Sequence, residues 1–446
     1  MRPIPEIIAA IATAPGRGGI GIVRVSGENL ASFAKAIMGK TPAPRHATFT
    51  PFLDADNLVI DQGLGLYFPS PHSYTGEDVL ELHGHGGMAV LQLVLQRCVE
   101  LGARIAEPGE FTKRAFLNDK LDLAQAESVA DLIEASTSQA ARSAIRSLQG
   151  EFSNAIHHLV ERLIQLRILV EAMLDFPEEG VDTLDISSRD KQLDALLKEL
   201  ENISGLAQQG SLLREGAHIV LIGQPNAGKS SLLNCMSGEE VALVSEIPGT
   251  TRDVIRQSIQ IGGVPLHIID TAGLHDSADV VEKMGIARTR ETILKADAAL
   301  IIIDVSQGMD EKDRKISDEL PPEIPRLYIF NKIDLFALPA RMEQTDRNIN
   351  IYLSAKTGEG LNLLQSKLLE LIGWHQQAGV FMARERHLHA LKNARENLLR
   401  AAKEVRRMEI FAEELRLAQV SLSSITGEFT ADDLLGEIFS HFCIGK

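Results

Sequence analysis

Residues 218–236 read HIVLIGQPNAGKSSLLNCM. The apolar run at the start is typical of a buried strand, residues 223–230 fit the pattern G-x-x-x-x-G-K-[ST], and a helical pattern begins at Ser231. In such a loop the glycines let backbone N–H groups curl around phosphates, and the helix N-terminus contributes its positive end. Lys229 is expected to reach the β- and γ-phosphates and Ser230 to bind Mg²⁺, so these residues predict a nucleotide-binding P-loop.

Two motifs with the spacing of GTPase switch regions follow the P-loop. Residues 248–253 read PGTTRD, in which Thr251 is the candidate Mg²⁺ ligand, with an ordinary turn as the alternative interpretation. A predicted strand, Leu266–Ile269, then leads into Asp270-Thr-Ala-Gly273. Asp270 is expected to act as the outer-sphere carboxylate of the magnesium ion, and the N–H of Gly273 to contact the γ-phosphate.

A second pair of motifs predicts that the base is guanine. Asn331-Lys-Ile-Asp334 follows the predicted strand Leu327–Phe330, and Ser354-Ala-Lys356 is the expected loop behind the base. The Asp334 carboxylate can accept the N1–H and the exocyclic amine of guanine, a donor pair that adenine lacks. Because nucleotides bind at the carboxyl ends of parallel strands, the motifs together predict a Ras-type G domain over residues 211–375 that hydrolyses GTP. The residues predicted to bind GTP are Asn226, Ala227, Gly228, Lys229, Ser230, Ser231, Ser245, Glu246, Ile247, Pro248, Gly249, Thr250, Thr251, Asp270, Thr271, Ala272, Gly273, Asn331, Lys332, Asp334, Ser354, Ala355 and Lys356.

The group that activates water differs from the one in Ras. The glutamine that follows the Asp-x-x-Gly motif in Ras is replaced by Leu274, which cannot orient water. Glu282 is the candidate for polarising the water, and a solvated helix charge is the alternative interpretation of this residue. No arginine finger can be assigned, and His275 has no assignable role.

Composition limits the class of protein. The chain has 446 residues, enough for about three domains, and its 44% hydrophobic and 24% charged residues are typical of a globular protein. No apolar run is long enough to cross a bilayer and the N-terminus is a poor signal peptide, so we expect a cytoplasmic protein with no membrane contact. Three distant cysteines predict no disulfide framework. With a net charge of −16, RNA contacts are expected to be local or made mostly by a partner.

The segments on either side of the G domain predict two further structural classes. The N-terminal segment has an α/β pattern, with strands at Ile20–Val25, Leu64–Phe68 and Val79–His83 and a helix at Gly87–Leu101 that ends at Gly102. Within the G domain, Gly262-Gly263 predicts a hairpin turn. Helical spacing covers Lys120–Leu148, Phe152–Leu174, Ala383–Ala412, Glu414–Ser424 and Asp432–Phe442, with breaks predicted at Pro177–Gly180 and Ser187–Asp190. The expected fold is therefore an N-terminal α/β domain (1–118), a discontinuous helical bundle (119–210 and 376–446) and an inserted Ras-like G domain (211–375).

Three other signals carry weaker interpretations. Residues 16–21 match G-x-G-x-x-G, but a strand follows them, which argues against a dinucleotide fold. His83 and His85 lack a third metal ligand nearby and are more often structural. The basic helix at Ala383–Arg407 could contact RNA, although a solvated face of the bundle is the favoured interpretation.

Four longer stretches carry a resemblance to a known family. They are residues 15–27 (PGRGGIGIVRVSG), 74–82 (YTGEDVLEL), 108–123 (PGEFTKRAFLNDKLDL) and 442–446 (FCIGK). With the order of the domains, they resemble the MnmE (TrmE) family of tRNA-modification GTPases. The resemblance implies an N-terminal domain that binds folate and forms a homodimer.

The resemblance also implies a reaction. Family members act with a flavin-dependent (FAD) partner, MnmG, in a heterotetramer that binds tRNA mainly through the complex. They install an aminomethyl-type group, such as carboxymethylaminomethyl, on C5 of the wobble uridine of certain tRNAs. A tetrahydrofolate derivative, 5-formyl- or methylene-tetrahydrofolate, supplies the one-carbon unit, and the amine is glycine or ammonium.

Site residues follow from the resemblance by position. Folate contacts fall on Arg24, Glu81, Lys120 and Lys446, for which a strand-edge contact or plain surface charges are the alternatives. A K⁺ ion that acts where other GTPases use an arginine finger falls on Asn226, Ser245, Ile247 and Thr250. A role for Cys443 near the folate stays open beside the interpretation as a core thiol. Two rival functions are a pure switch GTPase and a folate-dependent transferase whose G domain is only a scaffold.

Overall fold

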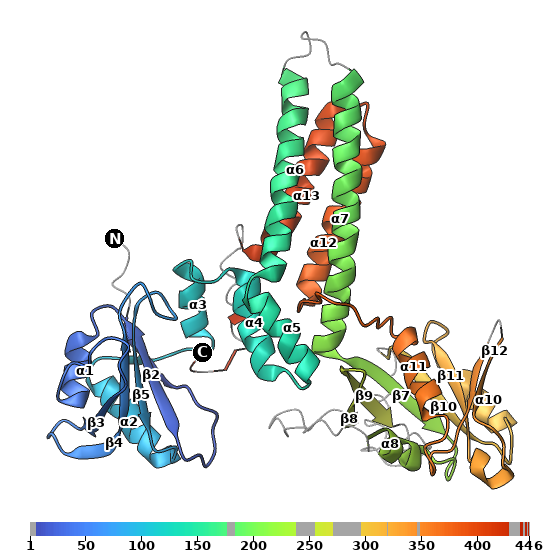
Figure 1. The fold of residues 1–446 in the computed structure, drawn as a ribbon, viewed down its shortest axis with the longest axis horizontal. Coiled ribbons are helices and arrows are strands. Elements are labelled where there is room, and N and C mark those ends of the chain that lie inside the picture. The colour runs from blue at the N-terminus through green and yellow to red at the C-terminus, as the bar shows by residue number, and fades with distance from the viewer. Residues whose placement is uncertain are drawn as a thin grey trace, which may run out of the picture. The chain divides into compact units, whose positions relative to one another are not determined.

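The computed structural model describes residues 6–175, 183–237, 255–270, 296–318, 320–345, 348–427, 438–439, 442–443 and 445. The chain divides into two units, which are described separately. The first contains Met1–Ala130, Leu148–Gln165 and Leu415–Lys446, and the second contains Asp131–Ser147 and Leu166–Glu414. Figure 1 labels most of the elements of both.

A six-stranded sheet forms the centre of the first unit, with the order β3-β4-β5-β2-β1-β6. All neighbours are antiparallel except β1 and β6. Val23 and Leu82 are register partners and are buried, so the side chains that alternate with them, Arg24 and Glu81, share the opposite face. The strands are β1 Ile8–Ile11, β2 Gly21–Gly27, β3 Thr48–Leu53, β4 Val59–Phe68, β5 Asp78–Gly84 and β6 Arg104–Ile105, and the helices are α1 Ala31–Met38, α2 Met88–Glu100 and α3 Glu110–Leu117. The predicted strands and the predicted helix of this segment are confirmed.

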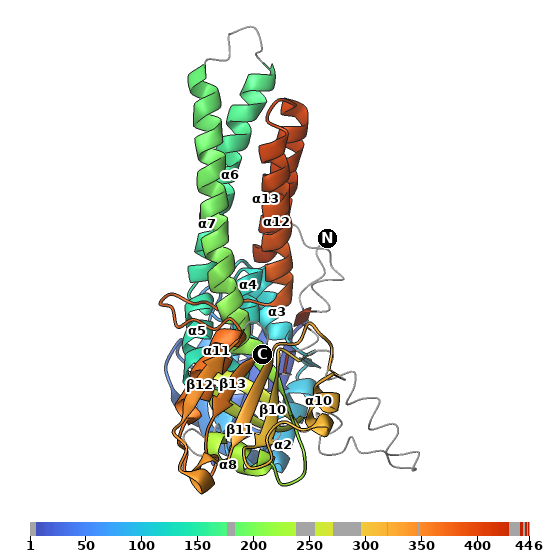
Figure 2. The same cartoon turned by 90° about the vertical axis from the view of Figure 1, so that its right-hand side faces the viewer.

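The helical segments form a discontinuous bundle, because helices from before and after the second sheet pack together. Helices α7 and α12 lie side by side in both views although about 170 residues separate their ends, and they are in direct contact (Figures 1 and 2). The helices are α4 Leu123–Glu134, α5 Ser138–Leu148, α6 Glu151–Asp175, α7 Thr183–Glu215, α12 Glu385–Lys403 and α13 Met408–Thr426. None of the helices in the described ranges has the length and apolar composition that a membrane span requires.

The predicted break at Ser187–Asp190 is wrong. These residues lie inside α7. The Arg189 side chain is only 4% exposed, and its guanidinium lies 5.1 Å from the centre of the Phe411 ring. A serine inside a helix is less favourable than an alanine by well under 1 kcal/mol of helix stability. The packing of Arg189 therefore outweighs the low helix propensity of the two serines. The other predicted break, at 177–180, lies outside the described residues.

Two other helix boundaries also differ from the prediction. The stretch Lys120–Leu148 is interrupted between α4 and α5, where the Thr137 hydroxyl accepts the Ala140 N–H at 3.0 Å as an N-cap. The predicted helix at Ala383–Ala412 breaks instead at residues 404–407, and α13 runs on from Met408 because Phe411 and Leu415 face the core at helical spacing. Most of the predicted helix at 432–442 lies outside the described residues.

The second unit contains a seven-stranded sheet with the order β12-β13-β11-β10-β7-β9-β8. The five inner strands are parallel, and the edge strands β8 and β12 are antiparallel to their neighbours. Strand β10 is buried on both faces, as a central parallel strand should be. The elements are β7 Ala217–Gly223, α8 Lys229–Ser237, β8 Ile255–Ile261, β9 Val264–Asp270, β10 Ala298–Asp304, α10 Glu311–Asp318, β11 Arg326–Asn331, the 3-10 helix η2 Ile333–Phe336, β12 Arg341–Gln344, β13 Ile349–Tyr352 and α11 Leu361–Leu371.

The predicted hairpin turn is confirmed. Gly262 and Gly263 join β8 to β9 with φ angles of 58° and 84°, which a residue with a side chain adopts only under strain. Both strands of this hairpin border segments outside the described residues, 238–254 before β8 and 271–295 after β9. Those two segments contain the predicted switch motifs.

Candidate functional site

The P-loop lies between β7 and α8, as predicted. Gly223 ends the strand and Lys229 begins the helix. Within the loop Asn226 has a left-handed backbone (φ 63°). A side chain at Gly228 (φ 102°) would overlap the amide of Asn331. The Lys229 ammonium donates to the Gly223 carbonyl at 2.6 Å, so it folds back onto the first residue of the loop.

Asn331 joins three of the predicted motifs. It ends β11 and is only 2% exposed. Its amide nitrogen donates to the Ala227 carbonyl of the P-loop at 2.9 Å. Its amide oxygen accepts the N–H groups of Lys332 and Ala355 at 2.8 and 2.9 Å. The P-loop and the two base-recognition motifs are therefore fixed to one buried side chain.

The predicted guanine-binding carboxylate, Asp334, is held in place by a hydrogen bond from a neighbouring loop. One oxygen of Asp334 accepts the Ser354 hydroxyl at 2.6 Å. Because a carboxylate has two oxygens, it keeps capacity for the N–H donors of a base. The last member of the loop behind the base, Lys356, is exposed.

Asp304 belongs to this site and was missed in the sequence. It ends β10, and its carboxylate accepts the Lys332 ammonium at 2.6 Å and the Ser306 hydroxyl at 2.6 Å. Burial acts to raise the pKa of Asp304, but the hydrogen bonds from Lys332 and Ser306 outweigh it, so the pKa lies below its ordinary value. The signal that could have identified Asp304 was a carboxylate at the end of an apolar strand, because the strands next to it in the sheet, β7 and β11, both end in motifs.

The magnesium side of the site is only partly described. Ser230 lies exposed in the first turn of α8. Asp270 ends β9, whose backbone pairs with Leu221 of β7, so this motif begins beside the P-loop strand. Serine and aspartate are residue types that suit a magnesium ion bound to phosphate oxygens. The predicted residues Ser245, Glu246, Ile247, Pro248, Gly249, Thr250, Thr251, Thr271, Ala272, Gly273, His275 and Glu282 lie outside the described residues.

A second candidate site lies on the sheet of the first unit. Arg24 and Glu81 are register partners on β2 and β5, and their side chains form an ion pair at 2.8 Å. The Arg24 guanidinium lies 5.5 Å from the centre of the Tyr74 ring and 5.8 Å from that of Phe111. The second oxygen of Glu81 lies 3.1 Å from Nε2 of His83. These side chains combine a carboxylate, a cation and aromatic faces, which fits a flat heterocycle with an acidic tail.

The three other residues that the resemblance assigns to the folate or its neighbourhood have different outcomes. Lys120 donates to the Pro71 carbonyl at 3.1 Å, and no contact with Arg24 or Glu81 is described for it. Lys446 lies outside the described residues. Cys443 is exposed, so its interpretation as a core thiol is wrong. The preceding residue, Phe442, is the one that packs into the apolar cluster, so the thiol faces outward.

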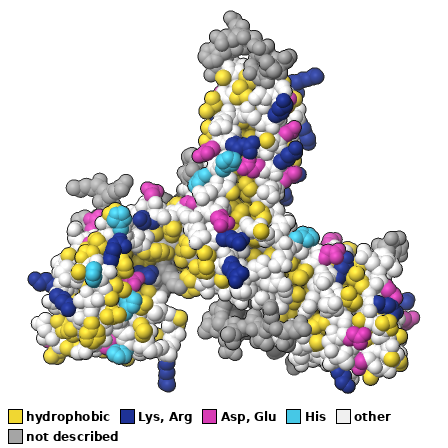
Figure 3. Space-filling view, in the orientation of Figure 1, with side chains coloured by type: hydrophobic (Ala, Val, Ile, Leu, Met, Phe, Trp, Pro, Cys, Tyr) yellow, Lys and Arg dark blue, Asp and Glu magenta, His cyan; other side chains and the backbone are white. Residues whose placement is uncertain are grey.

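The histidines and the basic helix can be placed as well. His83 contacts Glu81 and His85 contacts Asp61, so each is beside a different carboxylate. No group of three metal-ligating side chains converges in the part of the chain that is described. On α12, Arg395 pairs with Glu201 at 3.0 Å. Figure 3 shows acidic side chains beside basic ones over the long helices, which is typical of a solvated face.

Comparisons with known proteins cover the chain almost completely. The family description "GTP-binding protein TrmE N-terminus" matches residues 7–120, and "MnmE helical domain" matches residues 123–443. The tRNA modification GTPase MnmE of Nitrosomonas europaea is 60% identical over 447 residues, 99% of each chain. That of Chromobacterium violaceum is 57% identical over 444 residues, again 99% of each chain. Among solved structures, a variant of Aquifex aeolicus Era bound to GDP·AlF4⁻ is 21% identical with a TM-score of 0.28, covering 41% of this chain and 67% of that one.

Proposed function

Because this chain belongs to the MnmE family of tRNA modification GTPases, we propose that its GTP hydrolysis is stimulated by K⁺ and drives a folate-dependent change of the wobble uridine. The product is a carboxymethylaminomethyl-type substituent on C5. A homodimer of this chain acts with a flavin-dependent MnmG-type partner and with tRNA. The domains are 1–118, 119–210, 211–375 and 376–446. The observation that carries the GTPase half is the convergence of three motifs on the buried Asn331.

The residues of the G domain divide the work of hydrolysis. Lys229 offsets the charge of the phosphates, and Ser230 and Thr251 bind Mg²⁺, which polarises the phosphate oxygens when it is bound. Asp334, held by Ser354, selects guanine. Glu282 polarises the attacking water in the place that Leu274 cannot fill.

The K⁺ proposal rests on the P-loop and on the segment before Thr251. The neutral oxygens of Asn226, Ser245, Ile247 and Thr250 suit a large monovalent cation, which would offset charge that develops in phosphoryl transfer. Of these, Asn226 is described: it is exposed at the edge of the P-loop with a left-handed backbone, so its side chain is open to a ligand.

The folate proposal rests on the Arg24–Glu81 pair. Glu81 can accept pterin N–H donors while Arg24 stays packed beside Tyr74 and Phe111. Lys120 and Lys446 would attract the acidic tail of the folate. Cys443 is kept as a possible neighbour of the bound folate because its thiol is exposed.

GTP turnover of the purified full-length protein in KCl and in NaCl at equal ionic strength tests the first proposal. We expect strong stimulation by K⁺, and loss of turnover with intact nucleotide binding in Glu282→Ala. Equal rates in both salts would show that another group acts as the catalytic cation, and full activity of Glu282→Ala would remove this residue from catalysis.

Binding of 5-formyl-tetrahydrofolate tests the second proposal. Glu81→Gln is expected to weaken binding by roughly ten- to a hundredfold, since a charge-assisted hydrogen bond contributes roughly 1.5–3 kcal/mol. Glu100→Gln is a matched control, because Glu100 pairs with Arg97 in the same unit but away from this face. Equal affinity of both variants and the wild type would contradict the assignment.

A further inference from the structure

A glutamine in the P-loop is bonded to the start of a helix that carries no motif. The Gln224 amide nitrogen lies 2.9 Å from Oδ1 of Asp310 and 3.0 Å from Oδ1 of Asp313. Asp310 immediately precedes α10, and Asp313 lies in its first turn. The tether therefore connects the loop after β7 to the loop after β10.

The two aspartates form a closed arrangement. The Asp313 N–H donates to Oδ1 of Asp310 at 2.9 Å, and the Asp310 N–H donates to Oδ2 of Asp313 at 3.3 Å, as in a capping box. Asp313 is only 3% exposed. Two neighbouring carboxylates can accept but not donate hydrogen bonds, so the amide nitrogen of Gln224, not its oxygen, must face them.

The same glutamine also contacts the lysine that binds phosphate. The backbone carbonyl of Gln224 accepts the Lys229 ammonium at 3.0 Å, beside the bond from this ammonium to Gly223. The side chain of Gln224 is thus fixed to α10 while its backbone supports Lys229. A shift of the Gln224 backbone would move the carbonyl on which the ammonium rests.

We propose that Gln224 is a positioning residue that holds the P-loop, and through it Lys229, in the geometry that receives the phosphates of GTP. The role is to stabilise bound nucleotide rather than to act in the chemical step. It depends only on GTP binding and is independent of the K⁺ and folate proposals above, so the failure of either leaves it intact.

Three substitutions at this position distinguish a positioning role from a purely structural role in the full-length protein. Gln224→Leu removes the donor, Gln224→Glu places a third carboxylate beside two others, and Gln224→Lys keeps a donor for both aspartates. Gln307→Leu is the control, because Gln307 is exposed in the loop that precedes α10. Release of fluorescent GDP, KM for GTP, kcat and the thermal unfolding temperature are measured for each.

We expect Leu and Glu at position 224 to speed GDP release and raise KM about tenfold, with the larger effect for Glu, while kcat changes less than about twofold. Lys at this position and Gln307→Leu should behave as the wild type. Unchanged GDP release in both the Leu and the Glu variant would overturn the proposal, even if their unfolding temperatures fall, because the tether would then be structural only. A fall of kcat at constant KM, or equal losses in the Lys and Leu variants, would also overturn it.

Discussion

At the scale of single residues, His267 is a histidine whose protonation is expected to change the stability of the folded protein. It lies on β9 beside His218 of β7, with ring centres 5.1 Å apart. Its Nε2 lies 3.0 Å from the Glu215 carbonyl and its Nδ1 lies 3.0 Å from the Ser258 hydroxyl. Burial and then the neighbouring His218 lower the pKa of His267 below its ordinary value of 6.5, and the bond to Glu215 only partly opposes this.

This lowered pKa predicts a loss of stability in mild acid. Well above pH 6.5 the imidazole is neutral in the folded and the unfolded chain. As the pH falls through 6.5, the unfolded chain takes up a proton before the folded one, so the free energy of unfolding decreases until the folded pKa is reached. The unfolding temperature of His267→Gln should therefore fall less between about pH 7.5 and 5.5 than that of the wild type. As the control, His389→Gln, at an exposed position on α12, should show the same fall in unfolding temperature as the wild type. An equal fall for His267→Gln and the wild type would contradict the prediction.

Residues also show which parts of a site can be read from sequence. Lys229, Asn331 and Asp334 were predicted because backbone geometry and phosphate chemistry require their types at fixed spacing. Asp304 and Gln224 were not, because the side chains that connect them to other motifs or helices, Lys332 and Asp310, lie 28 and 86 residues away in the sequence and only the packing of the strands brings them together. The exposed thiol of Cys443 could not be inferred for the same reason.

At the scale of elements, one threonine connects a helix to the hairpin between the predicted switch segments. The Thr137 hydroxyl accepts the Ala140 N–H and donates to the Gly263 carbonyl, both at 3.0 Å. Thr137 is 5% exposed, so water does not replace either bond easily. The N-terminus of α5 is thereby fixed to the tip of the β8–β9 hairpin.

We expect Thr137→Val to destabilise this part of the protein by about 1.5–3 kcal/mol, the sum of a helix cap and a buried hydrogen bond. Val keeps the shape and removes the hydroxyl, whereas Thr137→Ser keeps the hydroxyl and serves as the control. Hydrogen exchange of the amides in β8 and β9 is the measurement. Acceleration in the Ser variant with none in the Val variant would show that methyl packing, not the hydroxyl, makes the contact.

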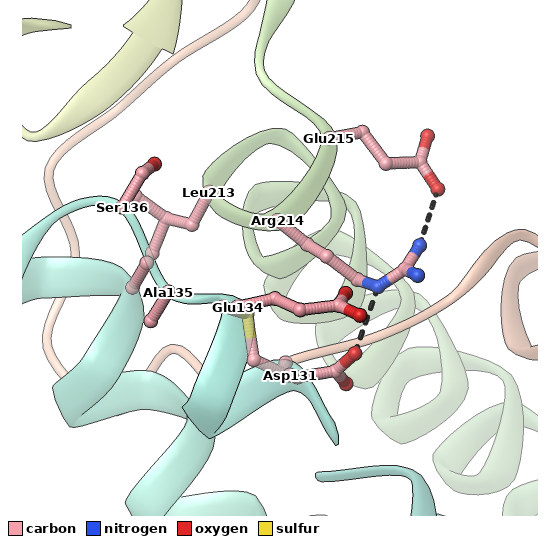
Figure 4. Close-up of a pocket in the computed structure, with 9 residues that line it drawn as sticks. Asp131, Glu134, Ala135, Ser136, Leu213, Arg214 and Glu215 are labelled. Carbon is pink, nitrogen blue, oxygen red and sulfur yellow. Dashed lines mark hydrogen bonds and ion pairs between the residues drawn. The ribbon is translucent and has the colours of Figure 1, made fainter. Parts of the chain in front are cut away.

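At the scale of the whole second unit, a single carboxylate holds the chain where it enters and leaves the G domain. Asp131 is only 3% exposed and accepts the Arg214 side chain at 2.9 Å, just before β7, and the Arg384 side chain at 2.7 Å, just before α12. Figure 4 shows Arg214 between Asp131 and Glu215. Gln209 adds bonds of 2.8 Å to the Gly373 carbonyl and the His375 N–H on the exit side.

Asp131→Asn is therefore expected to weaken the contacts that hold the chain where it enters and where it leaves the G domain. The substitution is isosteric but removes the negative charge that Arg214 and Arg384 share, at a cost of about 2–4 kcal/mol because both arginines keep some contact with water and Arg214 keeps its ion pair with Glu215. Limited proteolysis between residues 375 and 384 should become faster. Glu134→Gln, in the same pocket (Figure 4), is the control; unchanged proteolysis of Asp131→Asn would show that the other contacts are sufficient.

The strands and helices around the P-loop and the motifs themselves were predicted from the sequence, because strand periodicity, turn glycines and phosphate-binding motifs act over short spans. The continuity of α7 through Ser187–Asp190 and the attachment of the G domain by Asp131 and Thr137 were not. Both depend on side chains from distant segments that meet only in the folded chain, and their contact energies outweigh weak local propensities. Local rules therefore specified the elements and motifs, whereas long-range packing set where helices end and how motifs are held.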